Sequence, residues 1–361
     1  MLILLLLCFK YDKLLNMNGP AFDSAISRNG HDHRQGSRSS HFAQLLFVLL
    51  ALGLVFFFRD APQFRTLGII FVSIFLEALP FMLLGTLIGG FIEVFVPREK
   101  VTRWLPEGRW WTVFIGAGIG VMFPVCECAI VPVVRKLLQK GVPFSAAIAF
   151  LLGGPIVNPL VAASTAVAYF ADWSIVMHRM VLGYGIAVGV GLLMGLLFTK
   201  AQAVRKEVSA ASGPTHAPEI FATGKPADWA ENIGLAVSHA ADDFLDIGRF
   251  LVIGAFCAAA VQTLVPRQAF VAVMGTPGFS ILIMMLLAVL LNLCSEDDAF
   301  FAASFRSSLV PLPAQMAFMV LGPMLDIKLI LMYLKVFRIP AIAVLASLTF
   351  ITVFLCMLAI Y

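Results

Sequence analysis

Two short segments of the chain place sulfur and carboxylate side chains next to one another inside apolar sequence. The first segment is Cys126, Glu127 and Cys128, and the second, 168 positions later, is Cys294, Ser295 and Glu296. Thiolates are the ligands that soft ions such as zinc and copper(I) prefer, and trivalent arsenic shares this preference. The pattern predicts a site for a soft metal or metalloid, with Cys126 and Cys128 as the metal ligands. The alternative is that cysteine serves here as a small residue that lets helices pack closely.

Both segments lie within a longer pattern that occurs twice. Downstream of each segment, the same residue types recur at the offset of 168: Pro143, Gly154-Pro155 and Asn158 in the first copy, and Pro311, Gly322-Pro323 and Asp326 in the second. Upstream, at an offset of 169, Glu77 and Gly85 recur as Asp246 and Gly254. Two blocks in the same order indicate a duplicated unit, which is typical of transporters with internal repeats.

The composition places the chain in a membrane. Its 361 residues are 60% hydrophobic and 13% charged, with a mean hydropathy of +0.95, which leaves too little polar surface for a soluble protein. We therefore expect the lipid bilayer as a partner. The net charge of +4 does not indicate nucleic acid, because Lys and Arg in such chains mark cytoplasmic loops.

Gly and Pro interrupt several apolar stretches. Interrupted backbone is stable at membrane depth only where protein or a water-filled cavity satisfies its polar groups. Four interruptions occur in two matched pairs, near positions 124 and 292 and near 155 and 323, and they predict a central cavity. The expected fold is an all-α polytopic membrane protein with two structural repeats, each with a broken helix or re-entrant hairpin, plus flanking transmembrane helices.

The domain organisation follows from these interruptions and from uninterrupted apolar runs at about 42–58, 66–96, 175–198, 244–265 and 341–360. We expect a polar, disordered N-terminal segment (1–40), a first transmembrane helix and loop (41–65), repeat 1 (66–174), a connecting transmembrane helix (175–198), a flexible cytoplasmic linker (199–231), repeat 2 (232–340) and a C-terminal transmembrane helix (341–361). Either Met1 or Met17 could be the start of translation.

The distribution of basic residues indicates the orientation. Arg135, Lys136 and Lys140 follow the first Cys segment, whereas the equivalent stretch of the second copy holds only Arg306. If each Cys segment is the tip of a re-entrant hairpin, the basic loops of repeat 1 and the basic end of repeat 2 face the cytoplasm together. The repeats are then inverted, and the protein is expected in the cytoplasmic (inner) membrane.

Carboxylates at membrane depth are costly and therefore indicate function. Those expected to carry coupling protons are Glu296, Asp297, Asp298, Asp326, Glu77 and Asp246. For Glu77 and Asp246 a structural role, such as pairing with Arg249, is an equal alternative. The residues expected to bind substrate are Cys126, Glu127, Cys128, Asn158, Cys294 and Ser295.

Residues Phe123–Pro132, followed by Gly141-Val142-Pro143 and Gly154–Pro159, resemble the signature of the predicted permease family that includes YraQ-like proteins and ArsP-type organoarsenical efflux permeases. The stretch from Cys294 to Asp326 is similar to that family's second signature. In arsenical exporters of this kind, cavity cysteines take part in substrate binding, which the resemblance transfers to Cys126, Cys128 or Cys294. Glu127 departs from such exporters, where a smaller residue is expected.

The function predicted from these features is a secondary, proton-coupled exporter of a small soft-metal, metalloid or organometalloid species. No Walker motif supports ATP hydrolysis, and neither catalytic residues nor a cofactor are expected. The alternatives are a membrane-embedded thiol or metal-binding oxidoreductase and a non-transporting scaffold or sensor. Substrate identity, direction, coupling ion and oligomeric state stay open.

Overall fold

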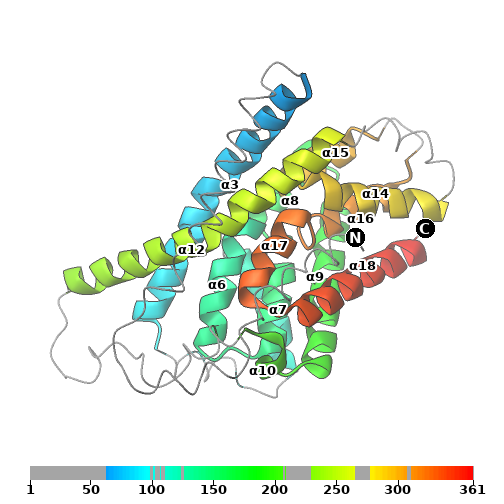
Figure 1. Ribbon diagram of the computed structural model, residues 1–361. Coiled ribbons are helices and arrows are strands. Elements are labelled where there is room, and N and C mark those ends of the chain that lie inside the picture. Colours follow the sequence, from blue (N-terminus) through cyan, green and yellow to red (C-terminus); the bar gives the residue numbers. More distant parts are fainter. Residues whose placement is uncertain are drawn as a thin grey trace, which may run out of the picture. The chain divides into compact units, whose positions relative to one another are not determined.

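The computed structural model describes residues 62–97, 101, 106, 110–122, 126–205, 208, 229–264, 277–306 and 310–360. Within these ranges the regular elements are helices, and one isolated bridge joins Val204 to Phe337 (Figure 1). The helices of the first half are α3 (Pro62–Phe95), α5 (Trp111–Gly118), η2 (Ile119–Met122), α6 (Glu127–Gln139), α7 (Phe144–Gly153), α8 (Pro159–Ala168) and α9 (Trp173–Leu197). They are followed by α10 (Lys200–Ala203), α12 (Trp229–Leu264), α14 (Pro277–Leu291), α15 (Asp297–Ala303), α16 (Leu312–Leu321), α17 (Ile327–Val336) and α18 (Ile339–Ile360).

Four of the described helices are long and apolar enough to span a bilayer. They contain Arg65–Phe95, Trp173–Leu197, Ile233–Thr263 and Ile339–Ile360, with hydropathies of 2.4, 2.1, 1.9 and 2.5. Together with several shorter apolar helices they confirm an all-α polytopic membrane protein. The run 42–58 lies outside the described residues.

Helix α12 is longer than hydropathy predicts. The apolar run begins near 244, but the helix begins at Trp229 and continues through Asp242 and Asp243. Asp243 is buried because it forms ion pairs with Arg135 and Lys136 of α6. Tertiary ion pairing therefore extends the helix through sequence that is polar on its own.

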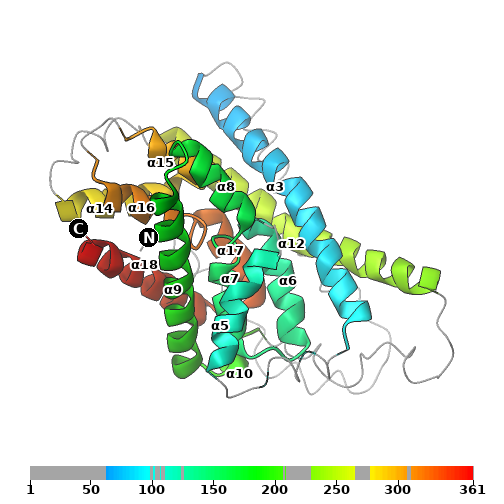
Figure 2. The same cartoon turned by 180° about the vertical axis from the view of Figure 1, so that it is seen from behind.

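The short helices form two hairpins with matching neighbours. Helix α7 packs on α5 and α9, and α16 packs on α14 and α18 (Figure 2 shows α5, α7 and α9 side by side). Each of these two short helices is preceded by a proline, Pro143 and Pro311, which fits the helix start because proline has no amide hydrogen to donate. The order of elements thus recurs between the halves. Duplication itself stays a prediction, and this agreement supports it.

Two glycines allow the long helices to cross the short ones closely. A Cβ atom at Gly85 of α3 would lie 2.4 Å from the carbonyl oxygen of Ala129 in α6. A Cβ atom at Gly254 of α12 would lie 3.1 Å from Cα of Lys328 in α17. Gly85 and Gly254 are matched positions of the two copies, so each half uses the same position to bring a long helix onto a broken one.

The start of the linker is held against the end of α17. The backbone amide of Arg205 donates to Val336 O (3.0 Å), and that of Arg338 donates to Ala203 O (2.8 Å). The ammonium of Lys200 donates to Leu138 O at the end of α6 (2.6 Å). Residues 199–205, the start of the expected linker, are thus joined to α6 and α17 by hydrogen bonds. Most of the remainder, up to 228, lies outside the described residues.

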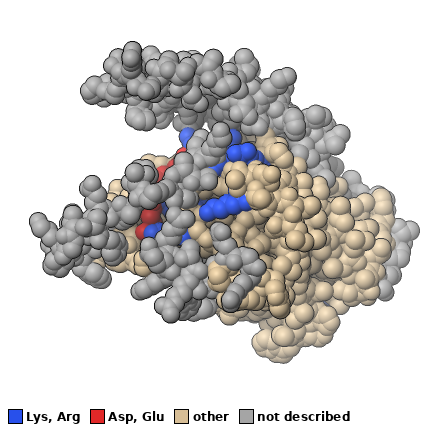
Figure 3. All heavy atoms as spheres, turned by 90° about the horizontal axis from the view of Figure 1, so that it is seen from below, with Lys and Arg blue, Asp and Glu red and all other residues tan. Residues whose placement is uncertain are grey.

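Charged side chains of the described residues are visible on the lower face of the molecule. Figure 3 shows this face from below, with blue and red atoms near its middle and a largely tan described surface around them. The ends of α6 and α17 and helix α10 lie toward this face in Figure 1.

Candidate functional site

The helix breaks of the two halves meet inside the protein. Helix α6 begins after Cys126, whose backbone is extended, and α15 follows the segment 292–296. The Cys294 thiol approaches the Glu127 carboxylate, with 3.8 Å between Sγ and Oε2. The ammonium of Lys328, in the first turn of α17, donates to Glu127 Oε1 at 3.0 Å. Residues separated by 167 and 201 positions thus form one site.

Two thiols and one carboxylate are close enough to share an ion. One donor atom each from Cys126, Glu127 and Cys294 lies within 4.8 Å of the other two. Cys126 also interacts with Cys128, one residue into α6. We call Cys126, Glu127, Cys128 and Cys294 the thiol–carboxylate cluster. Its sulfur-rich donor set suits soft ions and trivalent metalloids.

The cluster is enclosed. Cys126 and Cys128 are 1% exposed, Glu127 is 0% exposed and Cys294 is 6% exposed. The sequence predicts a central cavity at the four breaks, and that cavity stays a prediction. In this structure, protein covers the side chains of the cluster.

Lys328 supplies the positive charge next to the cluster. Its ammonium lies 3.6 Å from Asp326 Oδ2 in addition to its contact with Glu127, and its side chain is 4% exposed. Its backbone amide donates to Asn292 Oδ1 (3.2 Å), which ties α17 to the break before α15. One cation thus faces two carboxylates in the interior. A bound cation or proton would offset the remaining negative charge.

Arg179 of α9 supplies a second buried cation. Its Nη1 donates to Thr165 Oγ1 (2.7 Å) and its Nη2 donates to Ser295 O (2.8 Å). The guanidinium interacts electrostatically with Asp298. Arg179 therefore holds the second Cys segment against the first half of the chain.

The carboxylates of the second segment have different environments. Glu296 Oε2 accepts from the Cys294 thiol and from the Ser295 hydroxyl, each at 3.2 Å. Asp298 is buried against Gly322, where a Cβ atom would lie 2.5 Å from Oδ2. Asp297 is exposed and interacts with Glu77 of α3. Glu77 also interacts with Cys294, so that α3 reaches the cluster.

Near the cluster, the buried oxygens Glu296 Oε1 and Asp298 Oδ2 have no hydrogen-bond donor among the described residues, and Asp326 Oδ2 has only its ion pair with Lys328 at 3.6 Å. A buried oxygen of this kind is costly unless it takes up a proton or a cation. This part of the site can therefore bind a positive ion.

Asn158 and Asp326 occupy equivalent places. Asn158 Oδ1 accepts from the amide of Leu160 (2.9 Å) at the start of α8, and Asp326 Oδ1 accepts from the amide of Leu329 (2.5 Å) at the start of α17. Both residues are fully buried. Each caps the helix that follows a break, so that capping by itself explains the polar residue at both positions.

Asp246 lies outside this group. It forms ion pairs with Arg135 (3.0 Å), Arg249 (2.5 Å) and Lys335 (2.9 Å). The pairing with Arg249 that the sequence suggested is present. The structure therefore brings together Cys126, Glu127, Cys294, Glu296 and Asp326 but not Asp246.

Sequence reasoning missed Lys328 and Arg179. The signal was available, because each is a cation within apolar sequence, where an ionisable residue indicates function. At the 168-residue offset their counterparts are Leu160 and Ser347, so the repeat pattern did not draw attention to them.

Residues 63–361 match the model of a family described as "Predicted permease". UPF0718 protein YcgR of Bacillus subtilis (strain 168) is 41% identical over 276 residues, which cover 76% of this chain and 90% of the relative. A Streptococcus mutans (strain UA159) protein named "Putative two-component membrane permease complex subunit" is 39% identical over 269 residues, 74% of this chain and 86% of the relative. UPF0718 protein YraQ of Escherichia coli (strain K12) is 28% identical over 100 residues, 28% of each chain. No solved structure matches the chain.

Proposed function

Because this chain belongs to the predicted permease family, we propose that its thiol–carboxylate cluster is the substrate site of a secondary exporter. The membership agrees with the resemblance seen in the two Cys segments. A membrane permease is the function that the family and the spanning helices support. The description of the family and the name of the Streptococcus mutans relative both contain the word permease.

The proposed substrate is a small soft-metal, metalloid or organometalloid species. The observation that carries this proposal is the approach of Cys126, Glu127 and Cys294 to within 4.8 Å of one another. These residues come from both halves, so that a bound ion would join the two broken regions. Cys128, Asn158 and Ser295 complete the proposed site.

We propose that protons drive export. Asp298 and Glu296 each have a buried oxygen without a donor, and Asp326 has a single cation near its second oxygen; we propose that these carboxylates exchange protons as substrate binds or leaves. Glu77 and Asp297 provide a proton route from the exposed edge of α15. The proposal for Asp246 is weaker on geometric grounds, because three cations already neutralise it.

The proposed orientation places the basic ends of α6 and α17, together with linker 199–231, at the cytoplasmic side of the inner membrane. Lys136, Lys140, Lys200 and Lys335 lie at these ends, in agreement with the positive-inside rule. The hairpin α5–α6, whose tip is the first Cys segment, then opens toward the cytoplasm and the hairpin α14–α15 opens away from it, which would make the repeats inverted.

The test of the substrate site is a resistance and uptake screen across soft metals and metalloids, in cells with and without the gene, followed by cysteine variants. Cys126→Ser and Cys294→Ser remove little volume, so a ligand role predicts lost transport in protein that still reaches the membrane. The matched control is Cys257→Ser, a half-buried cysteine of α12. Parental transport by the Cys126→Ser/Cys294→Ser protein would show that these cysteines only pack.

The test of coupling is Asp326→Asn, which keeps the cap on α17 and makes the position equivalent to Asn158. We expect the protein to fold and bind substrate but to lose pH-driven flux. Unchanged pH-driven transport would eliminate Asp326 as a coupling residue.

A further inference from the structure

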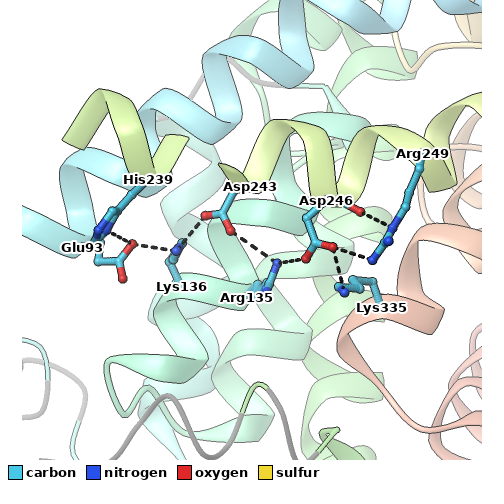
Figure 4. Close-up of polar contacts among 8 residues, drawn as sticks. All are labelled: Glu93, Arg135, Lys136, His239, Asp243, Asp246, Arg249 and Lys335. Atoms are coloured by element: carbon cyan, nitrogen blue, oxygen red, sulfur yellow. Dashed lines mark hydrogen bonds and ion pairs between the residues drawn. The ribbon is translucent and has the colours of Figure 1, made fainter. Parts of the chain in front are cut away.

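Eight charged or titratable side chains form a continuous network on one side of the thiol–carboxylate cluster. They are Glu93, Arg135, Lys136, His239, Asp243, Asp246, Arg249 and Lys335 (Figure 4). The network runs from Glu93 of α3 through Lys136 and Arg135 of α6 to Asp243 and Asp246 of α12, and ends at Lys335 of α17. Four helices from both halves are joined by it.

The network lies at a definite place relative to the cluster. Both α6 and α17 begin at the cluster, at Glu127 and just before Lys328, and both end in the network. At about 1.5 Å per residue, Arg135 lies ~12 Å along α6 from Glu127, and Lys335 lies ~10 Å along α17 from Lys328. The network therefore joins the far ends of the two helices whose starts hold the proposed substrate site.

Helix α12 holds these ends together. Asp243 lies 2.7 Å from Lys136 and 3.3 Å from Arg135, so that it binds α6. Asp246, one turn further on, lies 3.0 Å from Arg135 and 2.9 Å from Lys335, so that it bridges α6 to α17. The Lys136 and Asp243 side chains are 8% and 9% exposed, which limits screening by water and salt.

The opposite side of the cluster has no matching network among the described residues. At the repeat offsets, the counterparts of Arg135, Lys136, Asp243 and Lys335 are Ala303, Ser304, Ile74 and Val167. The described polar contacts there include one hydrogen bond from the Tyr169 hydroxyl to Gln315 (3.0 Å) and one from Arg306 to Tyr169 O (3.5 Å). Ion pairs therefore join the helices on one side of the cluster, whereas these contacts on the other side are hydrogen bonds.

We propose that the network is an ion-pair gate that closes the cytoplasmic side of the substrate site. This inference rests on the proposed permease function. In the closed state α12 pins α6 to α17, and opening requires the carboxylates of α12 to leave their cations. Because the described residues on the other side form no such ion pairs, the network biases the empty protein toward closure on the cytoplasmic side.

The test measures access to the cluster and needs no substrate. The background is Cys8→Ser/Cys257→Ser/Cys356→Ser, which leaves Cys126, Cys128 and Cys294 as the cysteines of the chain. A membrane-impermeant maleimide then reports how accessible these three thiols are. Added to cells it reaches them from the outside, and added to inside-out vesicles it reaches them from the cytoplasmic side. Asp243→Asn/Asp246→Asn keeps side-chain shape but removes both bridging charges. We expect roughly tenfold faster labelling from the cytoplasmic side and no change from outside, because labelling follows the open fraction.

The matched control is Asp242→Asn, which removes an exposed carboxylate from the same turn of α12 and should leave labelling unchanged. Lys335→Gln removes a single ion pair and should give an increase of roughly two- to threefold. A single symmetrical peak in size-exclusion chromatography establishes that each variant is folded.

The outcomes are distinct. Unchanged labelling in the folded Asp243→Asn/Asp246→Asn and Lys335→Gln proteins would overturn the gate and leave the network as a static brace. Faster labelling from outside alone would place the gate on the wrong side and also overturn it. If labelling rises as expected but the screen finds no transport of soft metals or metalloids, the gate stands and the proposed substrate class fails.

Discussion

Replacing Lys328 with methionine should destabilise the protein far more than any other single change of a lysine in α17. The methionine side chain is unbranched and one atom shorter than that of lysine, and it carries no charge. Glu127 and Asp326 are then left as buried carboxylates without their cation, 3.0 Å and 3.6 Å from where it lay. Because both are fully buried, water cannot replace the ammonium.

The two distances determine how much the loss of the Lys328 charge should destabilise the protein. At an effective dielectric constant of about 20, Coulomb's law gives roughly 5 kcal/mol for each contact. The cost of dehydrating the ammonium offsets much of this, and removing one partner of a buried ion pair typically costs about 3–5 kcal/mol. We therefore expect Lys328→Met to lower the melting temperature in detergent by about 6–10 °C, at ~2 °C per kcal/mol. Lys335→Met, on the same helix but 11% exposed, should cost less than ~1 kcal/mol.

A double-mutant cycle separates charge from packing. Adding Glu127→Gln to Lys328→Met removes one of the stranded carboxylates, so the double variant should be more stable than Lys328→Met alone, with a coupling of about 2–3 kcal/mol. The ion pair assigned to Glu127 and Lys328 would be refuted if the effects of the two substitutions on stability simply added. It would also be refuted if the Lys328→Met protein were as stable as the Lys335→Met protein.

Three further predictions concern packing, positioning and topology. Gly322→Ala should lower the free energy of unfolding by about 1–3 kcal/mol, because the added Cβ atom would displace the Asp298 side chain. The control is Gly185→Ala, whose Cβ atom would have no neighbour within 4 Å and should not lower it. Equal effects of the two substitutions would contradict the assigned packing. Arg179→Lys keeps the charge but cannot make both contacts to Thr165 and Ser295, so transport should fall more than membrane abundance, and parental transport would contradict a positioning role. Single cysteines at positions 104 and 212 should be labelled from the cytoplasmic side and one at 276 from outside; finding 104 and 276 on one side would disprove inverted repeats.

The sequence was sufficient to predict the class of fold, an all-α polytopic membrane protein. Long apolar runs gave three of the four described spanning helices closely, since length and hydropathy determine them. The start of α12 could not be predicted, because the ion pairs of Asp243 with α6 depend on the tertiary structure. The Cys segments were identifiable because cysteine and carboxylate recur at matched positions.

The pairing within the site was not predictable. The sequence placed Cys126 beside Cys128, but the donor set formed in three dimensions also includes Cys294 from the other half. Lys328 was overlooked because its partner Glu127 lies 201 positions earlier, and no local pattern connects them. Asp246 was grouped with the coupling carboxylates because it matches Glu77, yet its neighbours differ: Asp246 faces three cations and Glu77 faces Asp297 and Cys294.

The pairing of Glu127 with Lys328 also has a consequence for biosynthesis. The ribosome completes Glu127 201 residues before Lys328, which at about 5–20 residues per second is a delay of ~10–40 s. During that interval the first half is in the insertion machinery with a carboxylate whose counter-ion does not yet exist. Until α17 is made, the α6 segment must therefore remain near water, be held by the insertion apparatus, or carry Glu127 in its protonated form. Burial of an ionised Glu127 is thus a late step that requires the second half of the chain.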